Sequence, residues 1–518
     1  MRKFTAAAIL LVQAGLLAAI IMPAIVVFAD ELGLQQQLYN SDTVNVFLLA
    51  GDVLNDPASY FRWVVPPSFY LVPDLVLACA ILLAGVATPW QMPIFYAVSA
   101  TLQSLAVGLI LSRVRAVPAA FGMWAWAALL VLVGIFGLAA DDTLPSTLAF
   151  LRAPLAFYHS GALTLSLWGL WILLACAGTG KLRARLLWTL VALVVAGTFS
   201  DLVFLVWFVA PAVLALLATG RRTGNAAYRR LALLIAAAGA ATFIVEHLLN
   251  YAREAYLRAS DVWHPLGLLA GYLETFLRAP DIVAIAATFL LLASGWHAFV
   301  LFVSGRREDA GNPPNLAALF LGIGASGAVA GFIYVGRSVD LIEYRFLLPA
   351  FAYPFIWLLL RPGIARLARP VPAIALAAVP ALAAGGIAAF RFDQAPPTMS
   401  RDHADLIRCL DREGQVAGLS DYWDAMSVMH ASGGRIHAVA IAADGYGYLW
   451  NINRDWYFWR RDTGAEARFT YVIMHKLDPT AIAGRFGPPG REISCAGRTI
   501  WFYDHPIFPR GEDPAAPR

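Results

Sequence analysis

The feature of this sequence that most constrains its fold is an apolar run of about twenty residues that recurs along the chain, because a helix of that length crosses the hydrocarbon core of a bilayer. Twelve apolar segments are present, at approximately 5–28, 70–88, 92–112, 119–140, 156–178, 186–199, 201–219, 231–250, 281–304, 316–335, 346–360 and 370–390. Of the 518 residues, 60% are hydrophobic and 14% are charged. Soluble proteins are about half apolar and about a quarter charged. The sequence therefore predicts a polytopic α-helical membrane protein and excludes an ordinary soluble enzyme.

The first apolar segment is compatible with a signal peptide or with a first membrane helix. Residues 5–28 follow Arg2 and Lys3, and positive residues of this kind precede both signal peptides and first membrane helices. Their apolar core is longer than the roughly 7–15 residues of a signal peptide. We therefore predict a retained helix with a cytoplasmic N-terminus.

The scarce charges predict an orientation in the inner (plasma) membrane, because short loops rich in Lys and Arg stay cytoplasmic. The basic loops contain Arg113, Arg115, Lys181, Arg183, Arg185, Arg221, Arg222, Arg229, Arg230, Arg306, Arg307, Arg361, Arg366 and Arg369. With these inside, the acidic connections fall outside, and they contain Asp42, Asp52, Asp56, Asp141, Asp142, Asp201, Asp261 and Asp340.

Segment 70–88 conflicts with this orientation. Only an odd number of crossings can join an outer loop to an inner loop, but two apolar segments lie between the first outer loop and the inner loop at Arg113. The segment is short, and Pro73 and Asp74 interrupt its start. We predict that it is re-entrant or interfacial, which leaves about eleven transmembrane helices. If it does span, either a basic loop is external or the C-terminal domain is cytoplasmic.

Residues 391–518 are mixed polar and aromatic, and they are long enough to form a small soluble domain behind the membrane domain 1–390. We predict that this domain is α+β and periplasmic. A disulfide between Cys409 and Cys495 would be allowed there and would stabilise the domain by about 4 kcal/mol. The aromatic stretch 445–462 suits either a carbohydrate-facing surface or the core of the domain.

The first outer loop, 30–70, holds the most informative acidic residue. Asp42 precedes an amphipathic run, 44–54, that predicts a helix on the membrane surface. Either Ser41 or Asp42 caps that helix, or Asp42 is an ionised base that removes a proton from an acceptor hydroxyl. Arg62, with the aromatic residues and prolines around it, resembles an interfacial platform.

Three later outer loops, 141–156, 251–280 and 336–345, carry further polar groups. Asp141 and Asp142 are either a solvated turn or a pair that shares a divalent cation, Mg²⁺ or Mn²⁺. Arg152, His159, Tyr344 and Arg345 offer positive charge or hydrogen-bond donors that could bind a phosphate. The alternative is that these side chains only form ion pairs or pack within the protein. Asp201, which interrupts an apolar run, fits a helix cap better than a site.

These features resemble the GT-C superfamily of integral-membrane glycosyltransferases, especially the branch of the protein O-mannosyltransferases and the aminoarabinose lipid A transferase. The matching elements are Ser41-Asp42, Pro66-Pro67, Asp141-Asp142, the segment 343–354 and a soluble outer domain. The sequence departs from the pattern of this family at two places. It has Ser41-Asp42 where many members have Asp-Glu or Glu-Asp, and it has Val65 where the family usually has a His before Pro-Pro.

The resemblance implies inverting transfer of a sugar from a polyprenyl-phosphate carrier to a glycan, lipid or protein acceptor at the outer face. It implies that Asp42 is the base and that Asp141 or Asp142 orients the acceptor or binds a metal. Arg345 would hold the phosphate, helped by Tyr344, Arg62, Arg152 or His159. No nucleotide-binding or zinc-binding pattern occurs in the sequence, and the net charge of +4 does not indicate nucleic acid as a partner.

Two other classes stay open. A transporter or flippase of a lipid-linked sugar would show repeated halves and ionisable residues near the bilayer midplane. The sequence shows no clear repeat, and its acidic residues gather at the outer rim, which favours an enzyme. A structural membrane protein is the third possibility.

Overall fold

The computed structural model describes residues 10–19, 21, 39–65, 68–115, 117–140, 154, 159–177, 183–249, 282–304, 312–335, 346–367 and 401–509. The chain divides into two compact units. The helical unit comprises Met1–Ala24, Pro67–Pro73 and Tyr96–Phe390, and the α+β unit comprises Ile25–Pro66, Asp74–Phe95 and Arg391–Arg518. The predicted soluble domain therefore shares a unit with two segments of the predicted membrane domain 1–390.

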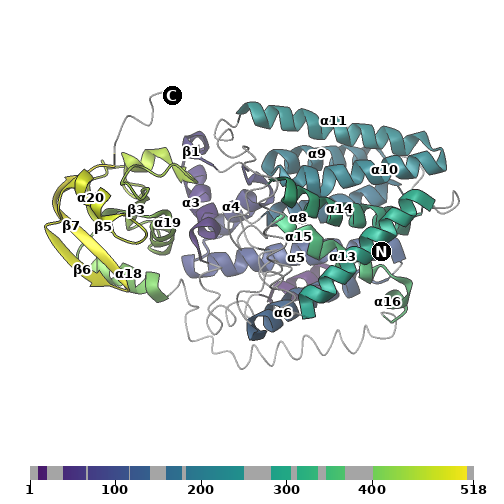
Figure 1. The fold of residues 1–518 in the computed structure, drawn as a ribbon, viewed down its shortest axis with the longest axis horizontal. Helices are drawn as coiled ribbons and strands as arrows, with labels where there is room; N and C mark the ends of the chain where they lie inside the picture. Colours follow the sequence, from purple (N-terminus) through teal and green to yellow (C-terminus); the bar gives the residue numbers. More distant parts are fainter. Residues whose placement is uncertain are drawn as a thin grey trace. The chain divides into compact units, whose positions relative to one another are not determined.

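The helical unit is built from long apolar helices (Figure 1). Its elements are α5 (Thr88–Arg115, in this unit from Tyr96 onward), α6 (Ala119–Ala140), α8 (Ser160–Ala177), α9 (Ala184–Ser200), η3 (Leu205–Val209), α10 (Ala210–Thr223), α11 (Ala226–Leu249), α13 (Ile282–Ser304), α14 (Pro313–Val335), α15 (Leu348–Leu359) and α16 (Pro362–Leu367). Helix α11 packs against α9 and α10, and α14 packs against α10, α13 and α15.

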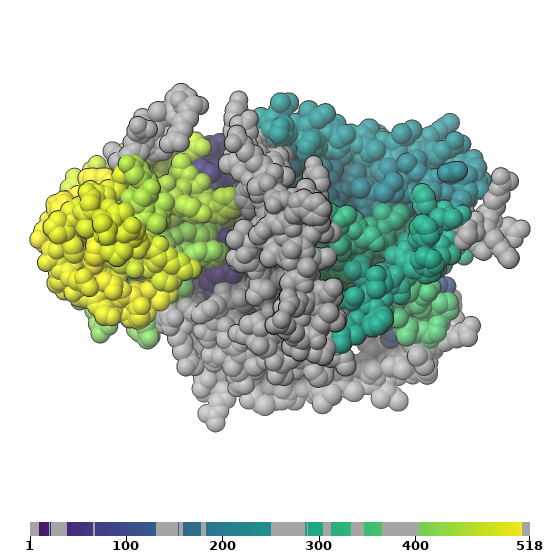
Figure 2. All heavy atoms as spheres, viewed as in Figure 1, coloured from purple at the N-terminus to yellow at the C-terminus, as the bar shows by residue number. Residues whose placement is uncertain are grey.

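Some of these helices form the core of the unit, and others expose apolar side chains on its outer surface. Helix α8 is buried over almost its whole length. Helices α11 and α13 instead expose large apolar side chains, such as Leu248 (70% exposed) and Trp296 (68%). In the space-filling view, the teal atoms that include α11 lie on an outer face of this unit (Figure 2). An apolar face of this kind is typical of a surface that contacts lipid.

Five helices among the described residues are long and apolar enough to cross a membrane: Thr88–Arg115, Ser160–Ala177, Leu205–Thr223, Ala226–Leu249 and Pro313–Phe332. The chain is thus a helical membrane protein, but this part of it does not show the expected eleven crossings. Shorter apolar helices stand at other predicted segments. Leu348–Leu359 lies at the predicted span 346–360, and Leu71–Leu83 lies in the segment predicted to be re-entrant or interfacial. A helix of about 12 residues spans roughly 18 Å, less than the roughly 30 Å of a bilayer core.

The α+β unit combines N-terminal helices with the C-terminal part of the chain. Its N-terminal elements are α3 (Ser41–Asn55), η1 (Pro57–Arg62), β1 (Trp63–Val64), α4 (Val76–Leu83) and the start of α5. The π-helical turn η2 (Leu71–Leu75) precedes α4. The C-terminal helical elements are α18 (Arg401–Arg412), α19 (Tyr422–Ala431), η7 (Arg454–Tyr457) and α20 (Pro479–Phe486). Helix α3 packs against both α4 and α19.

A five-stranded mixed sheet organises this unit, in the order β3-β2-β5-β7-β6. The strands are β2 (Ala417–Ser420), β3 (His437–Ala440), β5 (Phe469–Ile473), β6 (Arg491–Cys495) and β7 (Arg498–Ile507). Strand β2 is parallel to β3 and β5, and β7 is antiparallel to β5 and β6. The short strand β4 (Ile452–Asn453) pairs with β1, antiparallel. A side chain at Gly418 would overlap the Tyr471 ring on the neighbouring strand, so β2 and β5 need a glycine there.

Candidate functional site

Asp42 lies half-buried in the first turn of α3, so the predicted helix is present. The expectation that Ser41 or Asp42 caps it is wrong, because Asn40 is the N-cap and accepts a hydrogen bond from the backbone N–H of Thr43 at 3.1 Å. Capping therefore does not require the Asp42 carboxylate. The positive end of the helix dipole favours its ionised form.

The phenol of Tyr422 holds the Asp42 carboxylate. Its hydroxyl donates to Asp42 Oδ1 at 2.9 Å and accepts from Asn451 Nδ2 at 3.4 Å. Burial, followed by the charge of Asp42, raises the pKa of Tyr422 well above its ordinary value. The phenol therefore stays protonated and donates to the carboxylate.

Two asparagines complete this polar cluster inside the α+β unit. The side-chain amide of Asn45, on α3, donates to the backbone carbonyl of Asn451. Both side chains are buried, and the amide oxygens Asn45 Oδ1 and Asn451 Oδ1 have no hydrogen-bond partner among the described residues. Buried polar atoms in proteins are usually paired. These two oxygens are therefore acceptors with unused capacity beside Tyr422.

Further contacts between α3, the start of α5 and α19 fix the position of Tyr422. Ser41 Oγ lies 2.9 Å from the carbonyl oxygen of Tyr422 and 2.6 Å from that of Trp423. His430 Nε2 lies 3.0 Å from Gln91 Oε1. Burial, helped by the charge of Arg461, lowers the pKa of His430 to about 3, so this imidazole is neutral and packs as part of the core.

A second buried network anchors the C-terminal half of α3. Asp52 Oδ1 accepts from Arg461 Nε at 2.8 Å, and Asp52 Oδ2 accepts from Asn453 Nδ2 at 2.7 Å and from Trp63 Nε1 at 3.1 Å. Sequence reasoning placed Asp52 only in an acidic outer loop. Its charge instead forms an internal ion pair.

Arg62, expected to help bind a phosphate, lies at the end of η1. Its guanidinium contacts Asp56 at 2.5 Å and Asp455 at 2.7 Å, and all three side chains are exposed. The hydrogen bond from Arg62 lowers the pKa of Asp56. The structure therefore shows Arg62 in surface ion pairs, which a phosphate would have to displace.

A cluster that the sequence did not reveal lies at the start of α19, and we call Asp421, Asp424 and His475 the α19 charge cluster. Their ligand atoms lie within 4.8 Å of one another, close enough to hold a metal ion. However, Asp424 is already paired with Arg498 Nε at 2.8 Å and His403 Nε2 at 2.9 Å. Burial would raise the pKa of Asp424, but hydrogen bonds from His403 and Arg498 lower it overall. These contacts fit an ion-pair network better than a cation site.

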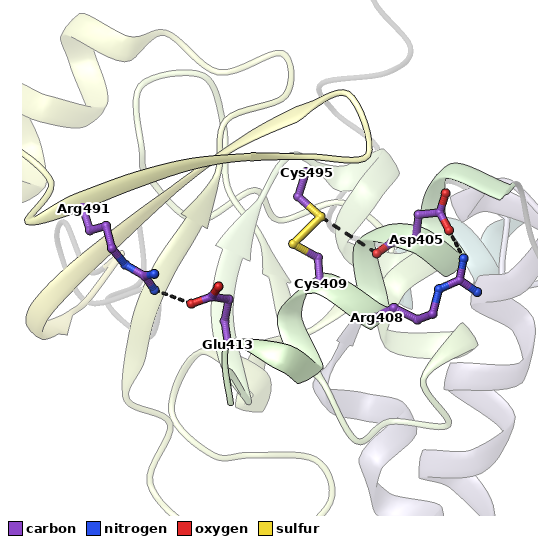
Figure 3. The surroundings of a disulfide bond; sticks show 6 residues. All are labelled: Asp405, Arg408, Cys409, Glu413, Arg491 and Cys495. Atoms are coloured by element: carbon purple, nitrogen blue, oxygen red, sulfur yellow. Dashed lines mark hydrogen bonds and ion pairs between the residues drawn. A yellow bond between two sulfur atoms is a disulfide. The ribbon is translucent and has the colours of Figure 1, made fainter.

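Cys409, on α18, and Cys495, at the end of β6, form a disulfide whose Cα atoms are 6.5 Å apart (Figure 3). It joins residues 86 positions apart in the sequence. An ion pair between Arg491 and Glu413, at 2.5 Å, links the same two regions. The bond therefore ties the first helix of the C-terminal part to the edge of the sheet.

In the helical unit, His159 forms a buried pair with Asp201. His159 Nδ1 lies 2.6 Å from Asp201 Oδ2, while Asp201 Oδ1 accepts from Ser68 Oγ at 2.9 Å and from the backbone N–H of Val203 at 3.2 Å. Asp201 is the C-cap of α9, whereas the sequence predicted an N-cap; its carboxylate nevertheless accepts from the N–H two residues later, as an N-cap side chain does. His159 Nε2 is buried and has no hydrogen-bond partner among the described residues.

The backbone at this pair is strained. His159 has a φ of 62° and Tyr70 a φ of 49°, in the left-handed region that residues other than glycine seldom adopt. Their rings lie 5.9 Å apart, and the His159 ring also packs 4.8 Å from that of Phe346. Strain of this kind gathers at functional sites.

Several predicted site residues lie outside the described residues: Asp141, Asp142, Arg152, Tyr344 and Arg345, with Pro66, Pro67 and the loop 251–280. Sequence reasoning also missed Tyr422, Asn45 and Asn451. A signal for Asn45 existed, because it is polar within the apolar run 44–50 and lies one helical turn after Asp42.

No protein-family model matches this chain, and a search of curated proteins found no significant match.

Proposed function

We propose that this protein is a membrane glycosyltransferase that moves a sugar from a polyprenyl-phosphate carrier to an acceptor hydroxyl, with inversion and with Asp42 as the base. The observation that carries the proposal is the hydrogen bond from Tyr422 to Asp42 Oδ1. It holds in place the carboxylate of the residue that sequence reasoning selected as the base.

The chemistry needs a single base. The acceptor oxygen bonds to the anomeric carbon, and the bond from that carbon to the carrier phosphate breaks. The hydroxyl proton passes to Asp42, and the electron pair leaves on the phosphate. A phosphate leaving group needs stabilisation of its charge rather than a strong acid.

The His159–Asp201 pair supports the phosphate-binding role proposed for His159. Asp201 accepts the Nδ1 proton and so orients the ring, which leaves Nε2 for another partner. When His159 is protonated, Nε2 donates to an anion. The other proposed phosphate ligands are Arg345, Tyr344, Arg152 and Arg62, and the proposed orienting or metal-binding residues are Asp141 and Asp142.

We further propose eleven membrane crossings, a cytoplasmic N-terminus and a periplasmic C-terminal domain in the inner membrane. The disulfide between Cys409 and Cys495 supports the location of that domain, because such bonds persist in oxidising compartments.

The test compares the wild type with Asp42→Asn in purified full-length protein. A pooled preparation of polyprenyl-phosphate sugars is supplied together with a cell-envelope extract as the source of acceptor hydroxyls, and release of the free carrier phosphate is measured. Asp42→Asn should lower release by about 10² to 10⁴-fold, as expected for loss of a base. Glu466→Gln, an exposed carboxylate of the same unit, is the matched control and should retain full release. Near-normal release by folded Asp42→Asn would refute the role of Asp42.

One observation favours transport of a lipid-linked sugar as a second candidate, namely the buried ionisable pair His159–Asp201 in the helical unit. Such pairs mark translocation pathways in transporters. The same assay separates the two functions, since a transporter moves the carrier intact and releases no free phosphate carrier.

A further inference from the structure

The polar groups around Tyr422 form a set of hydrogen-bond acceptors. Asp42 and Asn45 are three residues apart on α3, so they lie on one face of the helix. Asn45 Oδ1 and Asn451 Oδ1 are buried without a partner among the described residues. Leaving a buried acceptor unpaired is energetically unfavourable. A ligand that supplies several hydrogen-bond donors would therefore be stabilised here.

An exposed aromatic ring lies beside this set. The ring of Tyr448 is 5.9 Å from that of Tyr422, and Tyr448 is 38% exposed. The backbone at Tyr448 is fixed on both sides, because its N–H donates to the carbonyl of Ala440 at 3.1 Å and its carbonyl accepts from the Tyr457 hydroxyl at 3.2 Å. The backbone that carries the ring is therefore held in place, which lowers the ordering cost of stacking a ligand on it.

We propose that the acceptor of the transferred sugar is itself a carbohydrate, whose hydroxyls donate to Asp42, Asn45 and Asn451 and whose ring stacks on Tyr448. This inference rests on the proposed function and names the substrate class of the same site. A sugar fits because it offers several hydroxyl donors together with an apolar ring face. A phosphate headgroup offers mainly acceptors, and a serine or threonine side chain offers a single donor.

Saturation-transfer NMR is used to measure binding of uncharged tetrasaccharides to the full-length protein in lipid nanodiscs. The panel contains tetrasaccharides of glucose, mannose, galactose and arabinose. At least one tetrasaccharide should give a signal. Tyr448→Ala and Asn451→Gly should each weaken its binding by about fivefold or more. Glycine tolerates the φ of 49° at position 451, so that variant removes the amide without backbone strain.

Tyr446→Ala is the matched control. Tyr446 lies in the same loop and is 47% exposed, but its ring is covered by Arg485 at 3.7 Å. This variant should bind the tetrasaccharide normally, and Tyr448→Trp should retain binding by stacking. Absence of any signal, or equal binding by Tyr448→Ala, overturns the inference. Stronger quenching of Tyr448→Trp than of the wild type by brominated lipids overturns it too, because the added ring would then contact the bilayer.

The two proposals fail separately. Carrier release without tetrasaccharide binding would leave the glycosyltransferase standing and refute a carbohydrate acceptor. Tetrasaccharide binding that depends on Tyr448, without carrier release, would refute the glycosyltransferase and leave a carbohydrate-binding site.

Discussion

Replacing Asp52 with asparagine tests whether the buried pair with Arg461 anchors α3. Asp52 is 7% exposed and accepts hydrogen bonds from Arg461, Asn453 and Trp63. The substitution keeps the shape of the side chain but removes its charge, and it places an NH₂ group against donors. Arg461 then keeps a charge that is mostly buried, since its side chain is 17% exposed.

The expected cost follows from this burial. Removing one partner of a buried pair costs roughly 3–5 kcal/mol. The partial exposure of Arg461 gives its charge some access to water, so we expect about 3 kcal/mol. For domains of roughly 150–250 residues, each kcal/mol shifts Tm by about 2–4 °C, which predicts a loss of roughly 6–12 °C.

The assay is thermal unfolding of detergent-solubilised protein, followed by near-ultraviolet circular dichroism. Glu466→Gln is the control, because Glu466 and Arg468 form an exposed pair at 3.3 Å whose expected worth is below about 1 kcal/mol. An Asp52→Asn protein that melts within about 2 °C of the wild type would refute the anchoring role. Equal losses in the two variants would also refute it, because burial would then have no effect.

Three further outcomes are expected. Cys495→Ser should lower the free energy of unfolding by up to about 4 kcal/mol, checked by urea denaturation, and dithiothreitol should have no added effect on that variant. The pKa of His430 is about 3 in the folded protein, below its ordinary value of 6.5. Its contribution to the free energy of unfolding is therefore complete above pH 6.5. As the pH drops toward 3, that contribution falls by up to about 1.4 kcal/mol per pH unit. His430→Gln should reduce that slope in urea titrations. Treatment with EDTA should shift Tm by less than about 1 °C, because Arg498 and His403 already occupy the Asp424 carboxylate; a larger shift that Asp424→Asn removes would indicate a metal bound at the α19 charge cluster.

The sequence by itself determined the local features of this protein. Apolar runs predicted long helices, such as α8 and α11, because burial in lipid requires only the composition of one segment. The helix after Asp42 followed from the amphipathic run 44–54. The α+β character of the C-terminal part followed from its mixed composition.

Tertiary structure alone decided which distant residues meet. Tyr422 contacts Asp42 across 380 positions, and Arg461 contacts Asp52 across 409. Neither contact has a local pattern, because each depends on how α3 packs in the α+β unit. The shortness of Leu348–Leu359 was likewise decided by the fold, since hydropathy measures how apolar a segment is and not where its helix starts or stops.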